Sequence, residues 1–206
     1  MLPGVGACQP SAGGWLLGVD PASEQVTARI WLAGGQPKAV GAGPGGLWVA
    51  GYRDRQDHPG GVIEHTPLLW RVDPATTQVD GPLVPAGGPA ALLAADPSPP
   101  SVLASHDAVF ISDPPTGVVW QVDPHRRRFT GSLAVSQGGP LAAAAGVVWA
   151  GGASRLVPLT GPNAGGDGPR LLDPLGRWIT GLAASADTLW VATSDALYRI
   201  DPRRLG

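Results

Sequence analysis

The sequence predicts an all-β protein that repeats one short antiparallel unit along the chain. Its apolar runs are short, rich in Val, Leu, Ile and Trp, and bounded by Gly, Pro or Asp, which is the pattern of strands and turns. No window shows a sustained helical period. An aromatic-bearing run followed by a run ending in Asp-Pro recurs, most clearly at 47–50 with 68–74, 109–112 with 118–124, and 189–192 with 197–202. Small repeated β-units bury their faces by stacking on one another.

We assign four strands to each unit and name them A to D in chain order. The A strands consist mainly of small residues with few strongly hydrophobic ones: 38–42, 90–94, 141–145 and 179–184. The B strands carry an aromatic residue: 47–51, 109–112, 147–151 and 189–193. The C strands end in Asp-Pro: 15–21, 68–74, 118–124 and 197–202, with a degenerate copy at 155–162. The D strands are more polar: 25–32, 77–84 and 129–135, with a further one expected within 163–177.

Turn chemistry and spacing support this alignment. An Asp at the end of strand C can accept the backbone N–H two residues on, and Pro fixes φ, so Asp-Pro starts a C–D hairpin. Trp149 and Trp190 are 41 residues apart, and Phe110 and Trp149 are 39 apart. A period near 40 with four strands is the length of a β-propeller blade. The longer interval before Phe110 is assigned to two insertions, near 53–66 and 95–107.

The side chains change from small to large across each unit, as a propeller requires. The A strands are nearly all Ala, Gly and Leu, which suits inner strands that converge on an axis, whereas the aromatics of strands B and C fill the wider space between blades. We therefore predict a β-propeller of four-stranded antiparallel blades over residues 14–206, after an irregular segment at 1–13. The expected body is nominally five-bladed, with four well-defined blades and one partial blade. The alternative is a fragment of a six- or seven-bladed propeller with an open seam.

Two stretches carry a family resemblance. "GPGGLWVAG…LLWRVDPATTQV" and "ADTLWVATSDALYRIDP" resemble the YVTN/NHL type of bacterial β-propeller repeat, which is related to streptogramin-lyase-like and quinoprotein-like propellers. The resemblance covers about residues 14–205. It implies a propeller fold but no single function, because such blades carry many unrelated activities. It also suggests the cell envelope or an extracytoplasmic location, although the N-terminus lacks the charged and apolar regions of a secretory signal.

Composition narrows the classes of partner. The formal net charge of −2 gives no electrostatic case for nucleic acid or an anionic membrane. No apolar stretch approaches the ~20 residues of a transmembrane helix. Gly (31) and Pro (23) are abundant, but they fall between the apolar runs and so indicate turns. No cofactor is predicted, and an open propeller would allow self-association.

The predicted binding face lies where the B–C and D–A loops meet at the mouth of a propeller channel. We expect a protein, peptide or small ligand to bind there, with no catalytic role for these residues. The candidates are Lys38, Arg53, Asp54, Arg55, Asp57, His58, His65, Asp113, Arg155 and Asp195.

The 53–66 insertion is the densest polar segment in the chain and has two interpretations. It is a ligand-binding loop, or it is a solvated loop that is merely long, since loop insertions cost little. The alternative function is a propeller enzyme, a lyase or hydrolase assisted by a divalent ion, that uses His58, Glu64 and His65. The two histidines lie seven residues apart, which matches no standard metal spacing, so no metal site is predicted. A third possibility is a structural fragment that a partner must close.

Four sequence patterns of known chemistries are absent or incomplete in this chain. The B strands end Val-Ala-Gly, Ile-Ser-Asp, Ala-Gly-Gly and Val-Ala-Thr, whereas streptogramin-lyase-like blades end Trp-Phe-Thr-Glu, which argues against that activity. The quinoprotein-like stretch at 113–120 occurs once and is one residue short of that family's motif. There is no Gly-x-Ser-x-Gly elbow and no phosphate-binding Gly-x-x-x-x-Gly-Lys pattern.

Overall fold

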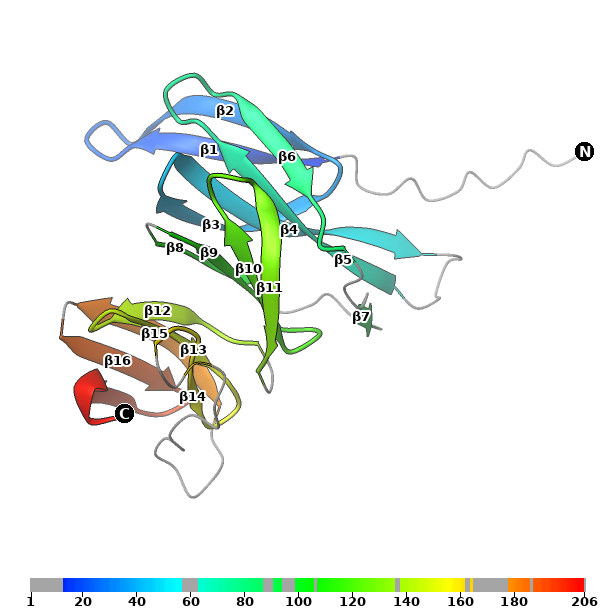
Figure 1. The fold of residues 1–206 in the computed structure, drawn as a ribbon. Coiled ribbons are helices and arrows are strands. Elements are labelled where there is room, and N and C mark those ends of the chain that lie inside the picture. The colour runs from blue at the N-terminus through cyan, green and yellow to red at the C-terminus, as the bar shows by residue number, and fades with distance from the viewer. Residues whose placement is uncertain are drawn as a thin grey trace, which may run out of the picture.

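The computed structural model describes residues 13–56, 63–86, 91–93, 99–105, 107–135, 138–161, 164, 178–185 and 187–205. The fold is all-β and of propeller type. Five antiparallel sheets follow one another in chain order (Figure 1). Within each sheet path, strands consecutive in the chain pair as antiparallel neighbours, because Gly, Pro and Asp separate the apolar runs.

The strands are numbered in chain order and grouped here by sheet. The first sheet contains β1 (Gly13–Asp20) and β2 (Gln25–Ala33). The second contains β3 (Gln36–Gly43), β4 (Gly46–Gln56), β5 (Ile63–Val72) and β6 (Val79–Leu83), and β7 (Ala91–Leu93) pairs with the start of β5. The third contains β8 (Ser101–Ala104), β9 (Val109–Asp113), β10 (Val118–Asp123) and β11 (Arg128–Ala134).

The last two sheets show three strands each within the described residues. The fourth sheet contains β12 (Leu141–Ala144), β13 (Val147–Gly151) and β14 (Leu156–Pro158). The fifth contains β15 (Ile179–Ser185), β16 (Thr188–Thr193) and β17 (Leu197–Ile200), and a short 3-10 helix, Pro202–Arg204, follows it. The D strand expected within 163–177 falls outside the described residues, apart from residue 164.

One strand prediction was wrong. The segment 90–94 was expected to be the A strand of the third sheet, with 95–107 as an insertion. Instead Ser101–Ala104 forms that strand and pairs with β9, from Ser101 opposite Ser112 to Ala104 opposite Val109. Ala91–Leu93 pairs with β5 of the preceding sheet. Both segments are short and carry small or apolar residues, so strand pairing decided between them.

The Asp-Pro turns behave as predicted. The side chains of Asp20, Asp73 and Asp123 accept the backbone N–H two residues later, at distances of 2.8–2.9 Å. The hydrogen bond from the Ala22 backbone N–H lowers the pKa of Asp20, and a backbone hydrogen bond likewise lowers the pKa of Asp73 and of Asp123. These three carboxylates therefore stay ionised and fix the C–D hairpins.

Apolar side chains lie between successive sheets rather than in one central core. Four clusters of buried residues join the first sheet to the second, the second to the third, the third to the fourth and the fourth to the fifth. Side chains alternate along each strand, so one strand serves two interfaces. On β4, Trp48 and Ala50 face the third sheet, while Val49 faces the first.

The innermost strands are packed closely, which explains their small residues. A Cβ added to Gly43 would lie 2.1 Å from the Cβ of Ala104, and one added to Gly41 would lie 2.9 Å from the Val102 carbonyl oxygen. No side chain larger than hydrogen fits at these two positions of β3 while β8 stays where it is. The expected change from small inner to bulky outer residues is therefore confirmed for this pair of sheets.

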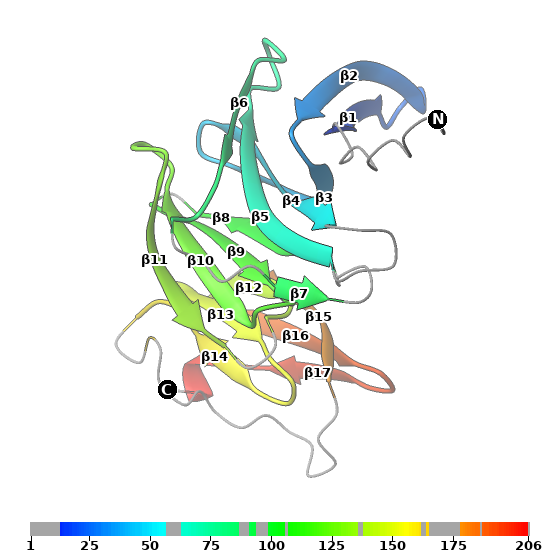
Figure 2. The same ribbon diagram turned by 90° about the vertical axis from the view of Figure 1, so that its right-hand side faces the viewer.

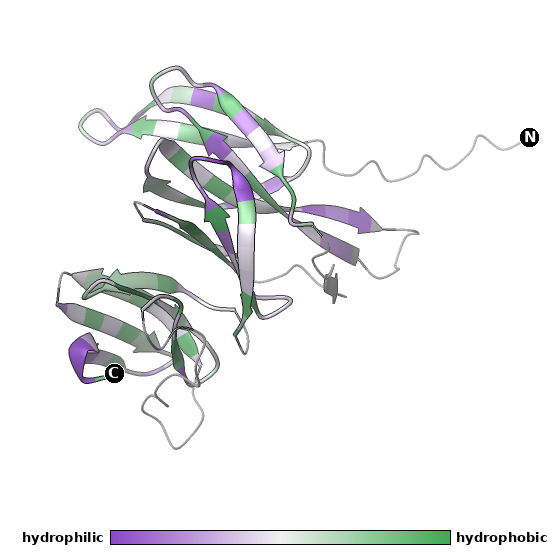
Figure 3. Cartoon of the chain, viewed as in Figure 1, coloured by the Kyte–Doolittle hydropathy of each residue, from purple (hydrophilic) through white to green (hydrophobic). Residues whose placement is uncertain are grey.

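The sheets form an open arc. In both views the first sheet lies at one end and the fifth at the other, with the second, third and fourth between them (Figures 1 and 2). Figure 3 shows hydrophobic residues alternating along the strands of the body, and a hydrophilic end on β4, where it projects from the second sheet. Within the described residues, no helix is long and apolar enough to span a membrane.

Candidate functional site

A polar cluster lies where β4 and β5 leave the body of the second sheet. Trp48, Ala50, Tyr52 and Asp54 alternate along β4 and therefore share one face. His65 pairs with Asp54 across the ladder and so lies on the same face. The first two residues of this row pack against apolar residues of the third sheet. The interface between the two sheets thus becomes polar at this end.

Tyr52 and Asp113 join the second sheet to the third. The Tyr52 hydroxyl donates to Asp113 Oδ1 at 3.0 Å, and the Thr116 hydroxyl donates to Asp113 Oδ2 at 2.6 Å. Both Tyr52 and Asp113 are buried. Burial raises the pKa of Asp113, and the two hydrogen bonds offset part of that rise. Burial, together with the negative charge of Asp113, raises the pKa of Tyr52, so its hydroxyl stays protonated and remains a donor.

His65 and Asp54 form the second part of the cluster. His65 Nδ1 lies 2.7 Å from Asp54 Oδ1, and the imidazole is only 1% exposed. Its ring meets the Tyr52 ring edge to face, with centroids 5.9 Å apart. His65 Nε2 is buried and has no hydrogen-bond partner in the described structure. The carboxylate therefore fixes the orientation of the ring through one nitrogen and leaves the other unused.

The insertion at 53–66 is not a loop at its two ends, which corrects the prediction. β4 and β5 continue as a paired ladder from Arg53 opposite Thr66 to Gln56 opposite Ile63. We call these eight residues, 53–56 and 63–66, the β4–β5 ribbon, which projects to the right in Figure 1. The prediction failed because the segment has few apolar residues, and its strand pairing extends a ladder that begins in the body.

The candidate residues now have definite places. Asp54, His65 and Asp113 come together in the polar cluster. Arg53 is exposed and its Nε donates to the Gly34 carbonyl oxygen at 3.0 Å, so the D–A turn of the first sheet lies beside the B–C end of the second. The other described candidates do not join the cluster: Lys38 and Arg55 are exposed, Glu64 is half-buried opposite Arg55, and Arg155 and Asp195 lie in the turns after β13 and β16. Asp57 and His58 fall outside the described residues.

Two members of the cluster were missed from the sequence. Tyr52 directly follows the predicted B strand, and its alternation with Trp48 and Ala50 could have placed it on the same buried face. Thr116 lies in the turn after Asp113, where its hydroxyl can reach back to that carboxylate. Among the described residues, no group of three or more His, Cys, Asp or Glu side chains is arranged to hold a metal ion.

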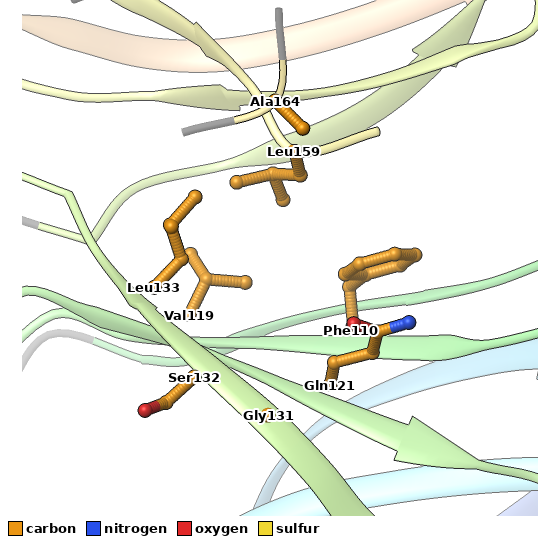
Figure 4. A pocket seen from close by; sticks show the side chains of 8 residues that line it. All are labelled: Phe110, Val119, Gln121, Gly131, Ser132, Leu133, Leu159 and Ala164. Atoms are coloured by element: carbon orange, nitrogen blue, oxygen red, sulfur yellow. The ribbon is translucent and has the colours of Figure 1, made fainter. Parts of the chain in front are cut away.

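A separate pocket lies between the third and fourth sheets (Figure 4). Its volume is about 150 Å³, below the roughly 300–1,000 Å³ of pockets that take small-molecule ligands. Apolar side chains of Phe110, Val119, Leu133 and Leu159 dominate its wall, and Gln121 and Ser132 add polar groups. The pocket is therefore too small for a ligand of ordinary size.

Comparison with known proteins assigns this chain to no family. No protein-family model matches the chain, and no curated protein matches it. The solved structures that align over most of its length include a catalytically inactive virginiamycin B lyase from Staphylococcus aureus with quinupristin (14% identity, TM-score 0.49, 80% of this chain and 66% of that chain). They also include the Neurospora crassa Pan2 WD40 domain (8%, 0.47, 84% and 64%) and Kuenenia stuttgartiensis hydrazine synthase (11%, 0.45, 93% and 52%).

These similarities concern the fold alone. All three TM-scores are below 0.5, so the propeller-type assignment rests on the five sheets and their packing. The chain spans 66%, 64% and 52% of the three solved structures. The expected YVTN/NHL type of repeat stays a prediction.

Proposed function

We propose that this chain is a non-catalytic propeller-type scaffold that recognises an extended segment of a partner protein along the outer edge of β4 in the β4–β5 ribbon, opposite β5. The single observation that carries the proposal is the asymmetry of the ribbon's two edges. On one side β7 pairs with β5, from Ile63 opposite Leu93 to His65 opposite Ala91. On the other side β3 pairs with β4 only as far as Gln36 opposite Tyr52.

The β3–β4 ladder thus stops short of residues 53–56. Among the described residues, no strand pairs with this part of β4 on that side. A strand edge with no neighbouring strand offers backbone N–H and C=O groups to an added strand. Backbone hydrogen bonds to such an edge supply affinity, and neighbouring side chains supply selectivity. Arg53 and Arg55 lie on one face of the edge, and Asp54 lies on the other.

The polar cluster gives this edge a rigid base. Asp54 holds His65 across the ribbon, and Tyr52 at its foot bonds to Asp113 of the third sheet. Arg53 is tied to the turn that precedes β3. A binding edge held in one conformation loses less entropy when a partner binds, which raises affinity. The buried residues Tyr52, His65 and Asp113 thus support recognition without touching the partner.

Selection from a phage library of random linear peptides would test this function. We expect selected peptides to bind the wild-type chain and to lose at least about tenfold in affinity, about 1.4 kcal/mol, when residues 55–64 are replaced by Asn-Gly. That replacement makes a two-residue hairpin turn between Asp54 and His65, so it removes most of the edge and keeps the base. Binding would be measured by fluorescence polarisation of labelled peptide.

A matched control lies at the opposite ends of the strands. Arg126 and Arg128 are exposed near the turn between β10 and β11, and Arg126→Ala/Arg128→Ala should leave peptide affinity unchanged. Peptides that bind the shortened chain as well as the wild type would contradict the proposal. So would a library that yields no peptide specific for the chain.

A second candidate function is that of a propeller enzyme, a lyase or hydrolase, and one observation favours it. The contact between Asp54 and His65 Nδ1 leaves Nε2 without a partner, an arrangement that suits a general base. His58, the other histidine of this candidate, lies outside the described residues. The burial of His65 opposes the idea, because a substrate must reach Nε2 for proton transfer to occur.

Histidine reactivity would separate the two candidates. With diethyl pyrocarbonate we expect His125, which is exposed in the turn after β10, to be modified at least about tenfold faster than the buried His65. Peptide mapping by mass spectrometry gives both rates in one sample. Comparable rates at the two residues in the folded chain would favour the enzyme.

A further inference from the structure

The two ends of the arc expose faces that are buried at every internal interface. We call the face that a sheet turns toward the next sheet in chain order its trailing face, and the face turned toward the preceding sheet its leading face. Each of the four internal interfaces joins a trailing face to a leading face. The first sheet has no described sheet before it, and the fifth has none after it.

The aromatic residue of each B strand shows what a trailing face contacts. Trp48, Phe110 and Trp149 occupy the same place in β4, β9 and β13, and each is buried against the sheet that follows. Trp190 has this place in β16, yet it is 38% exposed. Leu197, on the neighbouring strand β17, is also exposed. It pairs with Ala192 of β16, which lies on the same face as Trp190, so Leu197 also belongs to the trailing face.

The residues of the C strands show that the leading face is buried in internal sheets and exposed in the first sheet. Counted back from their Asp-Pro turns, Val72 and Val122 match Val19, and Trp70 and Trp120 match Leu17. The four internal residues are buried, whereas Leu17 and Val19 of β1 are 51% and 55% exposed. Trp15 continues this exposed row and packs edge to face on Trp31 of β2, with ring centroids 5.0 Å apart.

We propose that a second copy of this chain covers these faces, with the trailing face of its fifth sheet packed on the leading face of the first. One face is of the trailing type and the other of the leading type, and the chain already packs these two types of face together four times. Each exposed face therefore matches the apolar surface that the other needs for burial. They lie at opposite ends of the arc and do not meet within one molecule (Figures 1 and 2). The contact is head to tail, which allows chains longer than two copies. This inference is independent of the proposed function.

Mixing two variants tests both the contact and its polarity. The full chain would be studied by analytical ultracentrifugation from about 1 to 200 µM, a range that spans micromolar dissociation constants. We expect the average mass of the wild type to rise with concentration and to exceed that of a dimer. Leu17→Asp and Trp190→Asp should each remain monomeric alone. An equimolar mixture should form a one-to-one dimer and nothing larger, because one intact face remains on each variant.

Controls keep the result interpretable. Val84→Asp places a charge on an exposed valine after β6, away from both faces, and should associate like the wild type. Leu197→Asp gives a second variant of the trailing face if Trp190→Asp fails to fold by circular dichroism. A wild type that stays monomeric across the range would overturn the proposal, since the faces would then meet within the chain or bind another protein. A Leu17→Asp variant that still dimerises would overturn the head-to-tail arrangement.

Discussion

Trp48→Ala is expected to lower the free energy of unfolding by about 3–5 kcal/mol, the usual cost of truncating a buried aromatic residue to alanine. The Trp48 side chain is fully buried between the second and third sheets, beside Val109 and Ile111. Its indole Nε1 donates to the Pro44 carbonyl oxygen at 3.2 Å. The substitution therefore leaves a cavity between two sheets and removes one hydrogen bond.

Trp190→Ala is the matched control for Trp48→Ala. Trp190 has the same place in the repeat but lies on the exposed trailing face, so its loss should cost about 1 kcal/mol or less. Urea unfolding followed by circular dichroism at low protein concentration, below the range of any association, gives both values. Equal losses for the two variants would show that the inter-sheet cluster around Trp48 does not stabilise the fold as described.

Asp113→Asn is expected to change how stability depends on pH. Burial raises the pKa of Asp113 above its value of about 3.9 in the unfolded chain. Between the two pKa values the folded chain binds more protons at this residue than the unfolded chain does, so this contribution to stability falls as pH rises. The amide does not titrate. The free energy of unfolding of the variant, relative to wild type, should therefore rise as pH increases from about 4 and level off above the folded pKa.

The difference between the two proteins isolates this residue. Asp20, Asp73 and Asp123 have lowered pKa values and contribute in the opposite sense, because their stabilisation is lost as pH falls below about 4. These three are present in both proteins, so their effects cancel. Urea unfolding from pH 4 to pH 8 would measure the difference, and a difference that does not vary with pH would contradict the assigned shift.

Tyr52→Phe tests the other half of this contact. It removes the hydroxyl that donates to Asp113 Oδ1 and should cost about 1.5–3 kcal/mol at pH 8, the usual range for a hydrogen bond to a charged group. The same change in the Asp113→Asn background should cost less, because the acceptor is then neutral. The coupling between the two positions would be obtained from a double-mutant cycle.

The repeat was predictable because each of its strands carries its own signals. Strands β4, β9, β13 and β16 were placed by an aromatic residue in a short apolar run, and β1, β5, β10 and β17 by the turn that follows them. These signals act between neighbouring residues, so a single sequence displays them. The small residues of β3 were also interpretable, since Gly41 and Gly43 have a close neighbour in β8.

The pairing of the strands was harder to predict from the sequence than their positions. Ala91–Leu93 and Ser101–Ala104 are both suitable inner strands, and only the ladder shows that the second pairs with β9. The β4–β5 ribbon was mistaken for a loop because its residues are polar, although they extend a ladder that starts in the body. Pairing depends on partners far along the chain, which a local pattern does not specify.

The sequence by itself determined the β-units, their order and their turns, because these follow from alternation, side-chain size and turn chemistry within a few residues. It also marked Asp54, His65 and Asp113 as candidates. Only the tertiary structure decided that these three join Tyr52 in one cluster, in which Asp54 is half-buried and the others are buried, and that Trp190 and Leu17 are exposed while their counterparts are buried. Burial depends on which sheet lies opposite a residue, and that is a property of the assembled arc rather than of any single repeat.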